Sequence, residues 1–403
     1  MFRPHNLSRH TFLDFKKRAQ FSECYLFFDS VVRIFSNHRE NLQPFDQMYR
    51  HFRSSAQSIP PAAFHNDYYV LTDMDSSGQN IIFWRPDIFW EIMNDESPLH
   101  EAENIIFDAA LSRSTSHLLF HGASFCFEQQ GIGICGISGT GKTTLALELA
   151  RRGFQLLSDE IIALHKIEGN FQAFPRIIAC DDNTRRLIDE ENSYLRLPQT
   201  DLHQGKVYFI DPWQLKNQLK HKSCPGQVIL FLEPALDDLN LTAKDHGSLV
   251  EVAVLANSPE FLTQIINIPE VSLIKRGQDP DGGGELITFF VGQEQRRAFR
   301  KICQAMKENI AYCVHRTVTS PDPDREPQLE PFNKKEALKH LLSYLRNVST
   351  PFYFDENLDK SSAMASISEV LVQAMRFTFY RLRPGNLSKT ADLVESLLVK
   401  RSI

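Results

Sequence analysis

The segment from Gly136 to Thr143 constrains this chain more than any other. Its eight residues, GISGTGKT, satisfy the pattern G-x-x-x-x-G-K-[ST] in full. Glycines in such a loop let backbone N–H groups turn inward around phosphate oxygens, and the helix that follows points its positive end at the same anion. The pattern therefore predicts a strand, a phosphate-binding loop and a helix, in that order.

The residues on both sides of the loop fit this prediction. The run GIGIC before it is typical of a strand, and KTTLALELARR after it is a helix-forming run that Gly153 ends. We expect Lys142 to reach the β- and γ-phosphates of ATP and the Thr143 hydroxyl to ligate Mg²⁺. The full set of residues expected to bind ATP is Gly136, Ser138, Gly139, Thr140, Gly141, Lys142, Thr143 and Thr144.

Two acidic residues, Asp159 and Glu160, follow the predicted helix and a short apolar run. A strand that returns beside the loop strand brings this pair to the phosphate end, because ligands lie at the carboxyl ends of parallel strands. One carboxylate is then placed to hold Mg²⁺ and the other to accept a proton from an attacking hydroxyl. A solvated acidic turn is the alternative, and the preceding loop favours the functional interpretation.

Over about fifty residues the sequence resembles the catalytic domain of HPr serine kinase/phosphorylase. That family has a His-Gly pair before its loop and a run T-A-L-E-L-x-x-R-G-H-R-L-x-x-D-D after it, where this chain has HGASF and then TLALELARRGFQLLSDE. The resemblance implies that Asp159 is the general base toward a substrate serine. It implies that His121 acts near the phosphates and that Glu160 replaces a metal-assisting Asp.

The family's E-I-R-G-L-G-I segment has no counterpart, since residues 174–177 read FPRI. The chain therefore looks more like the diverged HPr-kinase-related proteins, some of which phosphorylate ribosomal peptides. The resemblance implies an α/β fold with a P-loop kinase core of the HPr-kinase/phosphoenolpyruvate-carboxykinase type. An N-terminal α+β extension and a C-terminal helical segment would complete it. Because HPr-type enzymes form hexameric rings, a homo-oligomer is an expectation, although no residue pattern shows one.

Changes of composition along the chain predict four regions. Residues 1–105 form an N-terminal α+β region, with one or two aromatic-rich helices over 10–56 and a hairpin after Asp67. Residues 106–316 form the P-loop domain, and 317–332, with four prolines and many charges, read as a linker. Residues 333–403 contain amphipathic runs and are expected to form a helical region.

Composition excludes some classes of protein. A net charge of −6 gives no general reason to expect nucleic acid as a partner. The seven cysteines are odd in number and form no CxxC pair, which favours buried free thiols in a reducing compartment. No apolar stretch is long enough to cross a bilayer or to serve as a signal sequence, so a cytoplasmic protein without membrane contact is expected.

The function that these observations predict is transfer of the ATP γ-phosphoryl group to a Ser or Thr hydroxyl of a protein or peptide. Asp159, His121 and Lys142 are the catalytic candidates, and Thr143 and Glu160 the metal candidates. Two alternatives stay open, namely a small-molecule kinase on the same core and a non-catalytic protein whose partner surface depends on bound nucleotide. Arg176 is a further candidate for contact with a phosphate or an acidic substrate, and a surface arginine is the equal alternative.

Overall fold

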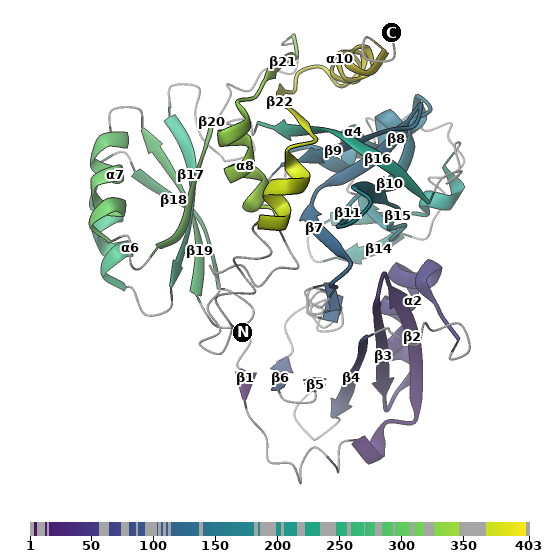
Figure 1. The fold of residues 1–403 in the computed structure, drawn as a ribbon. Coiled ribbons are helices and arrows are strands. Elements are labelled where there is room, and N and C mark those ends of the chain that lie inside the picture. The colour runs from purple at the N-terminus through teal and green to yellow at the C-terminus, as the bar shows by residue number, and fades with distance from the viewer. Residues whose placement is uncertain are drawn as a thin grey trace. The chain divides into compact units, whose positions relative to one another are not determined.

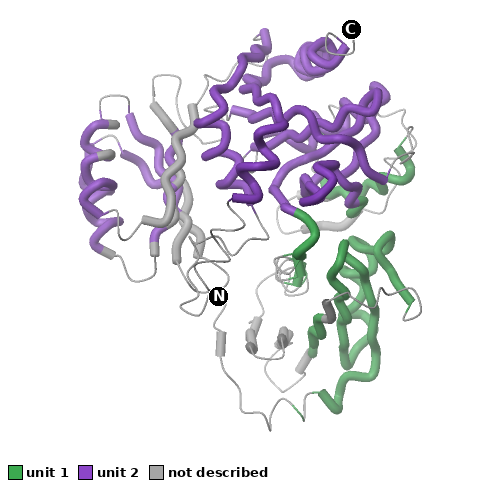
Figure 2. The backbone as a smooth tube through the Cα atoms, viewed as in Figure 1, with its two compact units in different colours: residues 1–117, 175–215 green, residues 118–174, 216–403 purple. Residues whose placement is uncertain are grey.

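The chain was analysed as a computed structural model of mixed α/β architecture (Figure 1). Its residues cluster into two units, 1–117 with 175–215 and 118–174 with 216–403 (Figure 2). The structure describes residues 4–5, 13, 16–55, 64–73, 80–85, 88–92, 103, 106–107, 110–111, 114–136, 140–180, 184–185, 199–202, 205–215, 222–233, 247–255, 259–269, 271–278, 284–292, 295–306, 310–317, 326–345 and 368–399.

The first unit is built on a six-stranded sheet in the order β1-β6-β5-β4-β3-β2. The strands β3 and β4 are parallel and the other described pairs are antiparallel. The predicted hairpin after Asp67 is confirmed, because β4 and β5 pair antiparallel. The bounds are β1 Pro4–His5, β2 Phe21–Phe27, β3 Ser30–Ser36, β4 Phe64–Asp73, β5 Asn80–Arg85 and β6 Ile88–Ile92.

The expectation of helices over 10–56 is wrong for its central part, where β2 and β3 form a hairpin. Tyr25 and Phe27 are buried and Leu26 between them is more exposed, which is the two-residue period of a strand. Helix α2 (Gln43–Tyr49) follows. At the hairpin turn Asp29 accepts hydrogen bonds from Ser114, Thr115 and Ser116. Burial raises the pKa of Asp29, but the hydrogen bonds from Thr115 and Ser114 together outweigh this effect and lower the pKa to about 2.

Residues 175–215 belong to the first unit, although the sequence placed them in the P-loop domain. They form a small antiparallel sheet of β13 (Ile178–Cys180), β15 (Gly205–Ile210) and β14 (Gln199–Leu202). The run at 206–213 is therefore a strand as expected, followed by a short 3-10 helix, Pro212–Gln214.

The second unit is built on a nine-stranded sheet whose main path is β10-β8-β9-β16-β12-β11-β7. The long strand β16 pairs in parallel with β9 on one edge. On its other edge its first residues pair with β12 and its last with β22, to which β21 is added. The bounds are β7 His117–His121, β8 Ala123–Phe127, β9 Gln130–Cys135, β10 Gln155–Ser158, β11 Ile161–His165, β12 Asn170–Gln172, β16 Ser223–Leu232, β21 Gln328–Pro331 and β22 Thr378–Arg383.

The C-terminal region departs from the helical expectation. Helices α8 (Lys334–Leu342) and α10 (Leu387–Val399) are present, and residues 368–374 are helical. The segment TFYRLR between the last two, however, is strand β22, which pairs in parallel with β16. Part of the expected linker is strand β21. Strand β22 therefore belongs to the same sheet as β9, the strand that precedes the GISGTGKT segment.

One hydrophobic core joins the sheet to its C-terminal additions. Phe231 of β16 contacts the rings of Phe332, Tyr344 and Phe379 at centroid separations of 5.4, 6.2 and 6.1 Å. Leu341 of α8 and Ala374 lie in the same core, both fully buried. Burial of a large apolar side chain such as Leu341 contributes about 1.5–3 kcal/mol, so α8 and the helical residues 368–374 are integral to this unit.

Residues 247–317 form a module that no motif in the sequence indicated. Its element order is β17 (Gly247–Leu255), α6 (Pro259–Ile266), β18 (Val271–Gln278), β19 (Gly284–Gly292), α7 (Arg296–Ala305) and β20 (Ile310–Thr317). The strands form an antiparallel sheet in the order β18-β19-β17-β20, which is the split β-α-β, or ferredoxin-like, arrangement. Both helices lie on one face of this sheet (Figure 1).

The cysteines differ in part from the free thiols that the sequence predicted. Cys126 of β8 and Cys224 of β16 form a disulfide, with their Cα atoms 5.9 Å apart. Cys24, Cys135, Cys180 and Cys303 are free thiols. Within the described residues, no helix has both the length and the apolar character that a membrane span requires.

Candidate functional site

The predicted strand, loop and helix are all present around the GISGTGKT segment. Strand β9 is buried along its whole length and ends at Cys135, and helix α4 (Lys142–Arg151) begins seven residues later. Thr140 and Lys142 are buried, whereas Gly141 is exposed. The candidates Ser138 and Gly139 lie outside the described residues.

Two of the loop glycines are required by the backbone. Gly141 has φ +82°, in the left-handed region that side chains disfavour. A Cβ on Gly136 would stand 2.6 Å from Oγ1 of Thr140, closer than real contacts allow. There is therefore too little room for a side chain at the first glycine of the motif.

The Lys142 side chain points back toward the start of the loop. Its Nζ donates a hydrogen bond of 2.8 Å to the carbonyl oxygen of Gly136. The residue is 8% exposed, so the ammonium group lies close to the backbone of the loop. A cation in this position suits an anion held by the loop amides.

The end of β10 brings Asp159 to the loop helix. The Thr143 hydroxyl donates a hydrogen bond of 3.4 Å to Oδ2 of Asp159. The strand before Asp159, β10, was expected to lie directly beside β9, the strand before the loop. This expectation is wrong, because β8 lies between β9 and β10 and is antiparallel to both. The two strands still run in the same direction, so Gly136 and Asp159 follow strand ends at the same edge of the sheet.

The second acid, Glu160, contacts the histidine candidate. Oε1 of Glu160 lies 3.1 Å from Nδ1 of His121, and the Glu160 carbonyl accepts a hydrogen bond from Gly122. The backbone N–H of His121 donates to the carbonyl of Tyr344. The structure thus pairs Asp159 with Thr143 and Glu160 with His121, whereas the sequence assigned Glu160 to the metal.

Glu233 is a buried acid at this edge that sequence reasoning did not single out. It directly follows β16, whose Phe231 stands opposite Cys135 of β9. Its side chain is 6% exposed and lies 2.7 Å from Nε of Arg383 and 3.8 Å from Nε of Arg381. The sequence signal that could have identified Glu233 is its position at the end of the apolar run QVILFL. Many P-loop proteins have a metal-organising acid at the end of such a strand.

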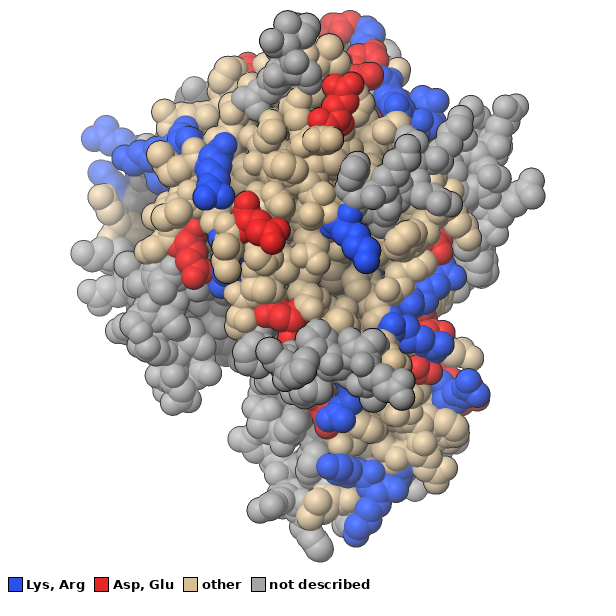
Figure 3. All heavy atoms as spheres, turned by 45° about the vertical axis from the view of Figure 1, so that its right-hand side comes forward, with Lys and Arg blue, Asp and Glu red and all other residues tan. Residues whose placement is uncertain are grey.

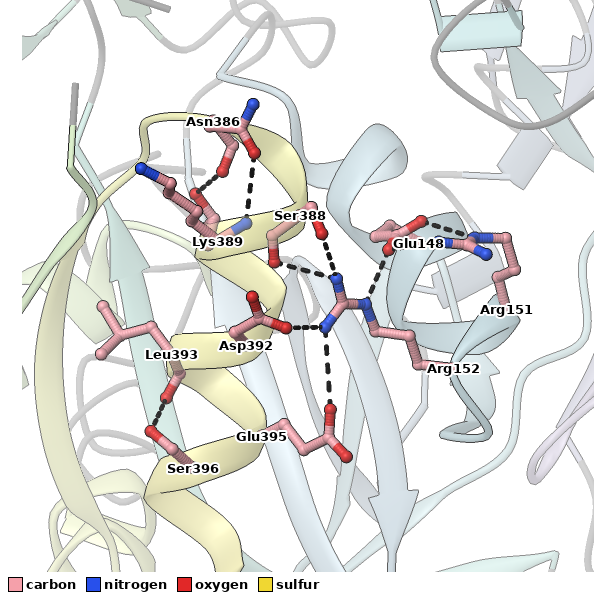
Figure 4. Close-up of polar contacts among 11 residues, drawn as sticks. Glu148, Arg151, Arg152, Asn386, Ser388, Lys389, Asp392, Leu393, Glu395 and Ser396 are labelled. Carbon is pink, nitrogen blue, oxygen red and sulfur yellow. Dashed lines mark hydrogen bonds and ion pairs between the residues drawn. The ribbon is translucent and has the colours of Figure 1, made fainter. Parts of the chain in front are cut away.

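The C-terminal end of α4 is fastened to α10 through Arg152 (Figure 4). Nε of Arg152 donates to Glu148 at 2.6 Å, and the rest of the guanidinium contacts Ser388, Asp392 and Glu395 of α10. Burial raises the pKa of Glu148, hydrogen bonds from Arg151 and Arg152 lower it, and the net pKa is below the usual value. Glu148 is therefore held as a buried carboxylate between two arginines.

The donor groups at the edge suit Mg²⁺ and phosphate in part. A hydroxyl and a carboxylate, from Thr143 and Asp159, are the hard oxygen donors that Mg²⁺ prefers with phosphate oxygens. Among the described residues, no group of three or more His, Cys, Asp and Glu side chains is placed to hold a metal by itself. The residues thus fit a metal shared with a bound phosphate better than a protein-only metal site.

Arg176, the further candidate, is held in the first unit. Its guanidinium lies 3.0 Å from the buried Glu103 and stands over the rings of Tyr49 and Phe107. These contacts account for the arginine as part of a packed interior.

No known family model matches the chain, and no curated protein matches it significantly.

Proposed function

We propose that this chain is a kinase that transfers the γ-phosphoryl group of ATP to a Ser or Thr hydroxyl of a protein or peptide. The hydrogen bond between Thr143 and Asp159 is the observation that carries the proposal. It joins the first turn of the loop helix to an acid from a separate strand. A glycine-rich structural turn has no need of such a carboxylate, whereas a phosphoryl-transfer site does.

The residues of this edge support a division of tasks. The loop amides and Lys142 offset the negative charge of the phosphates, which supplies most of the catalysis in this chemistry. Bound Mg²⁺, next to Thr143, would neutralise further charge on the phosphate oxygens. Asp159 takes the proton of the acceptor hydroxyl while the hydroxyl oxygen forms a bond to the γ-phosphorus. The bond between the γ-phosphorus and the oxygen that bridges it to the β-phosphorus breaks, and ADP leaves.

The contact with Thr143 gives Asp159 a second candidate role, that of organising the metal. The two roles predict different kinetics. A general base affects the rate of transfer at saturating Mg²⁺, whereas a metal-organising acid affects the Mg²⁺ concentration needed for half-maximal rate. His121 and Glu160 form a pair of their own, and we propose that Glu160 orients the His121 ring toward the phosphates.

The test is incubation with γ-labelled ATP and a panel of candidate proteins and peptides. Asp159→Asn should lower transfer by about 10²–10⁴-fold, and Glu168→Gln, which changes an exposed acid between β11 and β12, is the matched control. Thr143→Ala should raise the Mg²⁺ requirement. If Asp159→Asn raises that requirement equally and leaves the maximal rate unchanged, the base role is wrong and the metal role holds. Transfer at the wild-type rate and the wild-type Mg²⁺ requirement would contradict both.

A further inference from the structure

Helix α7 of the 247–317 module has an unusual charge pattern. Four of its ten residues are basic, namely Arg296, Arg297, Arg300 and Lys301, and none is acidic. The structure describes the side chains of Arg297 and Lys301, and both are exposed. Within the described part of the chain neither forms an ion pair. Since the chain as a whole carries a net charge of −6, the cluster does not follow from a basic composition.

This arrangement opposes the stability of the helix in two ways. Residues 296 and 300, and likewise 297 and 301, are like charges four positions apart, and each such pair costs about 0.2–0.5 kcal/mol. The cations also occupy the start of the helix, where the macrodipole favours anions; the first turn has no acid and the last turn no base. A charge pattern that is unfavourable for the helix itself suggests that the positive surface has another use.

The rest of α7 narrows what this surface can bind. Its opposite side packs into the core of the module through Phe299, Ile302 and Cys303, so the helix has no apolar side free to enter a membrane. The sheet face away from the helices holds Leu249 and Phe290, 1% and 5% exposed, and is not open for stacking of nucleobases. The basic surface can therefore bind a partner through its charge, but it has no apolar side to enter a membrane and no open face on which bases could stack.

Lys and Arg are interspersed with Asp and Glu over much of the face shown in Figure 3. Nucleic acid is disfavoured as a partner because a chain of net negative charge repels a polyphosphate backbone outside this one short helix. A short acidic segment of a polypeptide matches the length and sign of the surface.

We propose that the exposed basic side of α7 is a docking surface for an acidic polypeptide segment, carried by the phosphoryl acceptor. The identity of that partner as acceptor rests on the proposed kinase function, whereas the binding itself does not. Docking of this kind raises the association rate and selects partners by charge, without contributing to the chemical step.

The test uses the full chain and a fluorescein-labelled poly-glutamate peptide, followed by anisotropy at low salt. The wild-type chain should bind it, and Arg297→Glu with Lys301→Glu should weaken binding by roughly tenfold or more. The matched control reverses two other exposed lysines, Lys222→Glu with Lys335→Glu, and should bind as the wild type. Both pairs of side chains are exposed, and circular dichroism checks that each variant is folded.

Three results would overturn the proposal: no binding by the wild type, equal loss in both double variants, or tighter binding of a labelled oligonucleotide of equal charge. Label transfer from ATP separates the two proposals. If the chain is no kinase, the peptide still binds through α7 although no label is transferred. If the docking surface is wrong, transfer proceeds with an unchanged KM for the acceptor in the α7 double variant.

Discussion

Helices α4 and α7 have the same length, but their arginines are concentrated toward opposite ends. In α4 the two arginines lie at the C-terminal end, where the macrodipole favours cations, and both contact the buried Glu148. In α7 the cations lie at the N-terminal end, without an acid on the helix. The comparison suggests that the arginines of α4 stabilise the fold, whereas the cations of α7 serve to bind a partner.

Arg152→Ala should remove the charge compensation at the end of α4, and we expect it to lower the free energy of unfolding more than any other single change considered for these two helices. It removes one of the two cations on a carboxylate that is 4% exposed, together with the contacts to α10. We expect a loss of about 1–3 kcal/mol in the free energy of unfolding, measured by urea denaturation. Arg151→Ala is the matched control, because Arg151 contacts the same carboxylate from a more exposed position, with 41% of its side chain exposed. An equal loss in both variants would contradict a specific role for Arg152.

On α7, Arg297→Gln should have a small effect of the opposite sign. It relieves repulsion from Lys301 and removes a cation from the start of the helix, so the free energy of unfolding should rise by a few tenths of a kcal/mol. The gain should shrink at high salt, where surface charges are screened. Differential scanning calorimetry at two salt concentrations measures both effects. A clear loss of stability would mean that Arg297 already has a structural partner.

The loop and its helix could be predicted because their information is local. Residues 130–153 contain a complete motif, strong helix formers and a terminating glycine, and the structure places β9 and α4 there. The sequence also predicted the short strand that leads from the helix to Asp159. The position of β8 between β9 and β10 was not predicted, since strand order within a sheet depends on pairings that a local pattern does not specify.

The parts that were missed depend on distant pairing. Glu233 lies at the loop edge because β16 pairs with β9 across about a hundred residues, and β22 joins from much further along the chain. TFYRLR is too short to separate a strand from a helix by its period. The aromatic residues around Tyr25 and Phe27 were ambiguous for the same reason, since a short run of apolar side chains fits either a helix face or a strand.

The central claim is that the loop from Gly136 to Thr143 holds the phosphates of ATP. Isothermal titration calorimetry with MgATP tests it directly, on the wild-type chain and on Lys142→Ala. We predict one nucleotide per chain for the wild type and an affinity lower by roughly tenfold or more for the variant, because a charge-assisted contact contributes about 1.5–3 kcal/mol. No binding by the wild-type chain, or equal affinity in both proteins, would contradict the account.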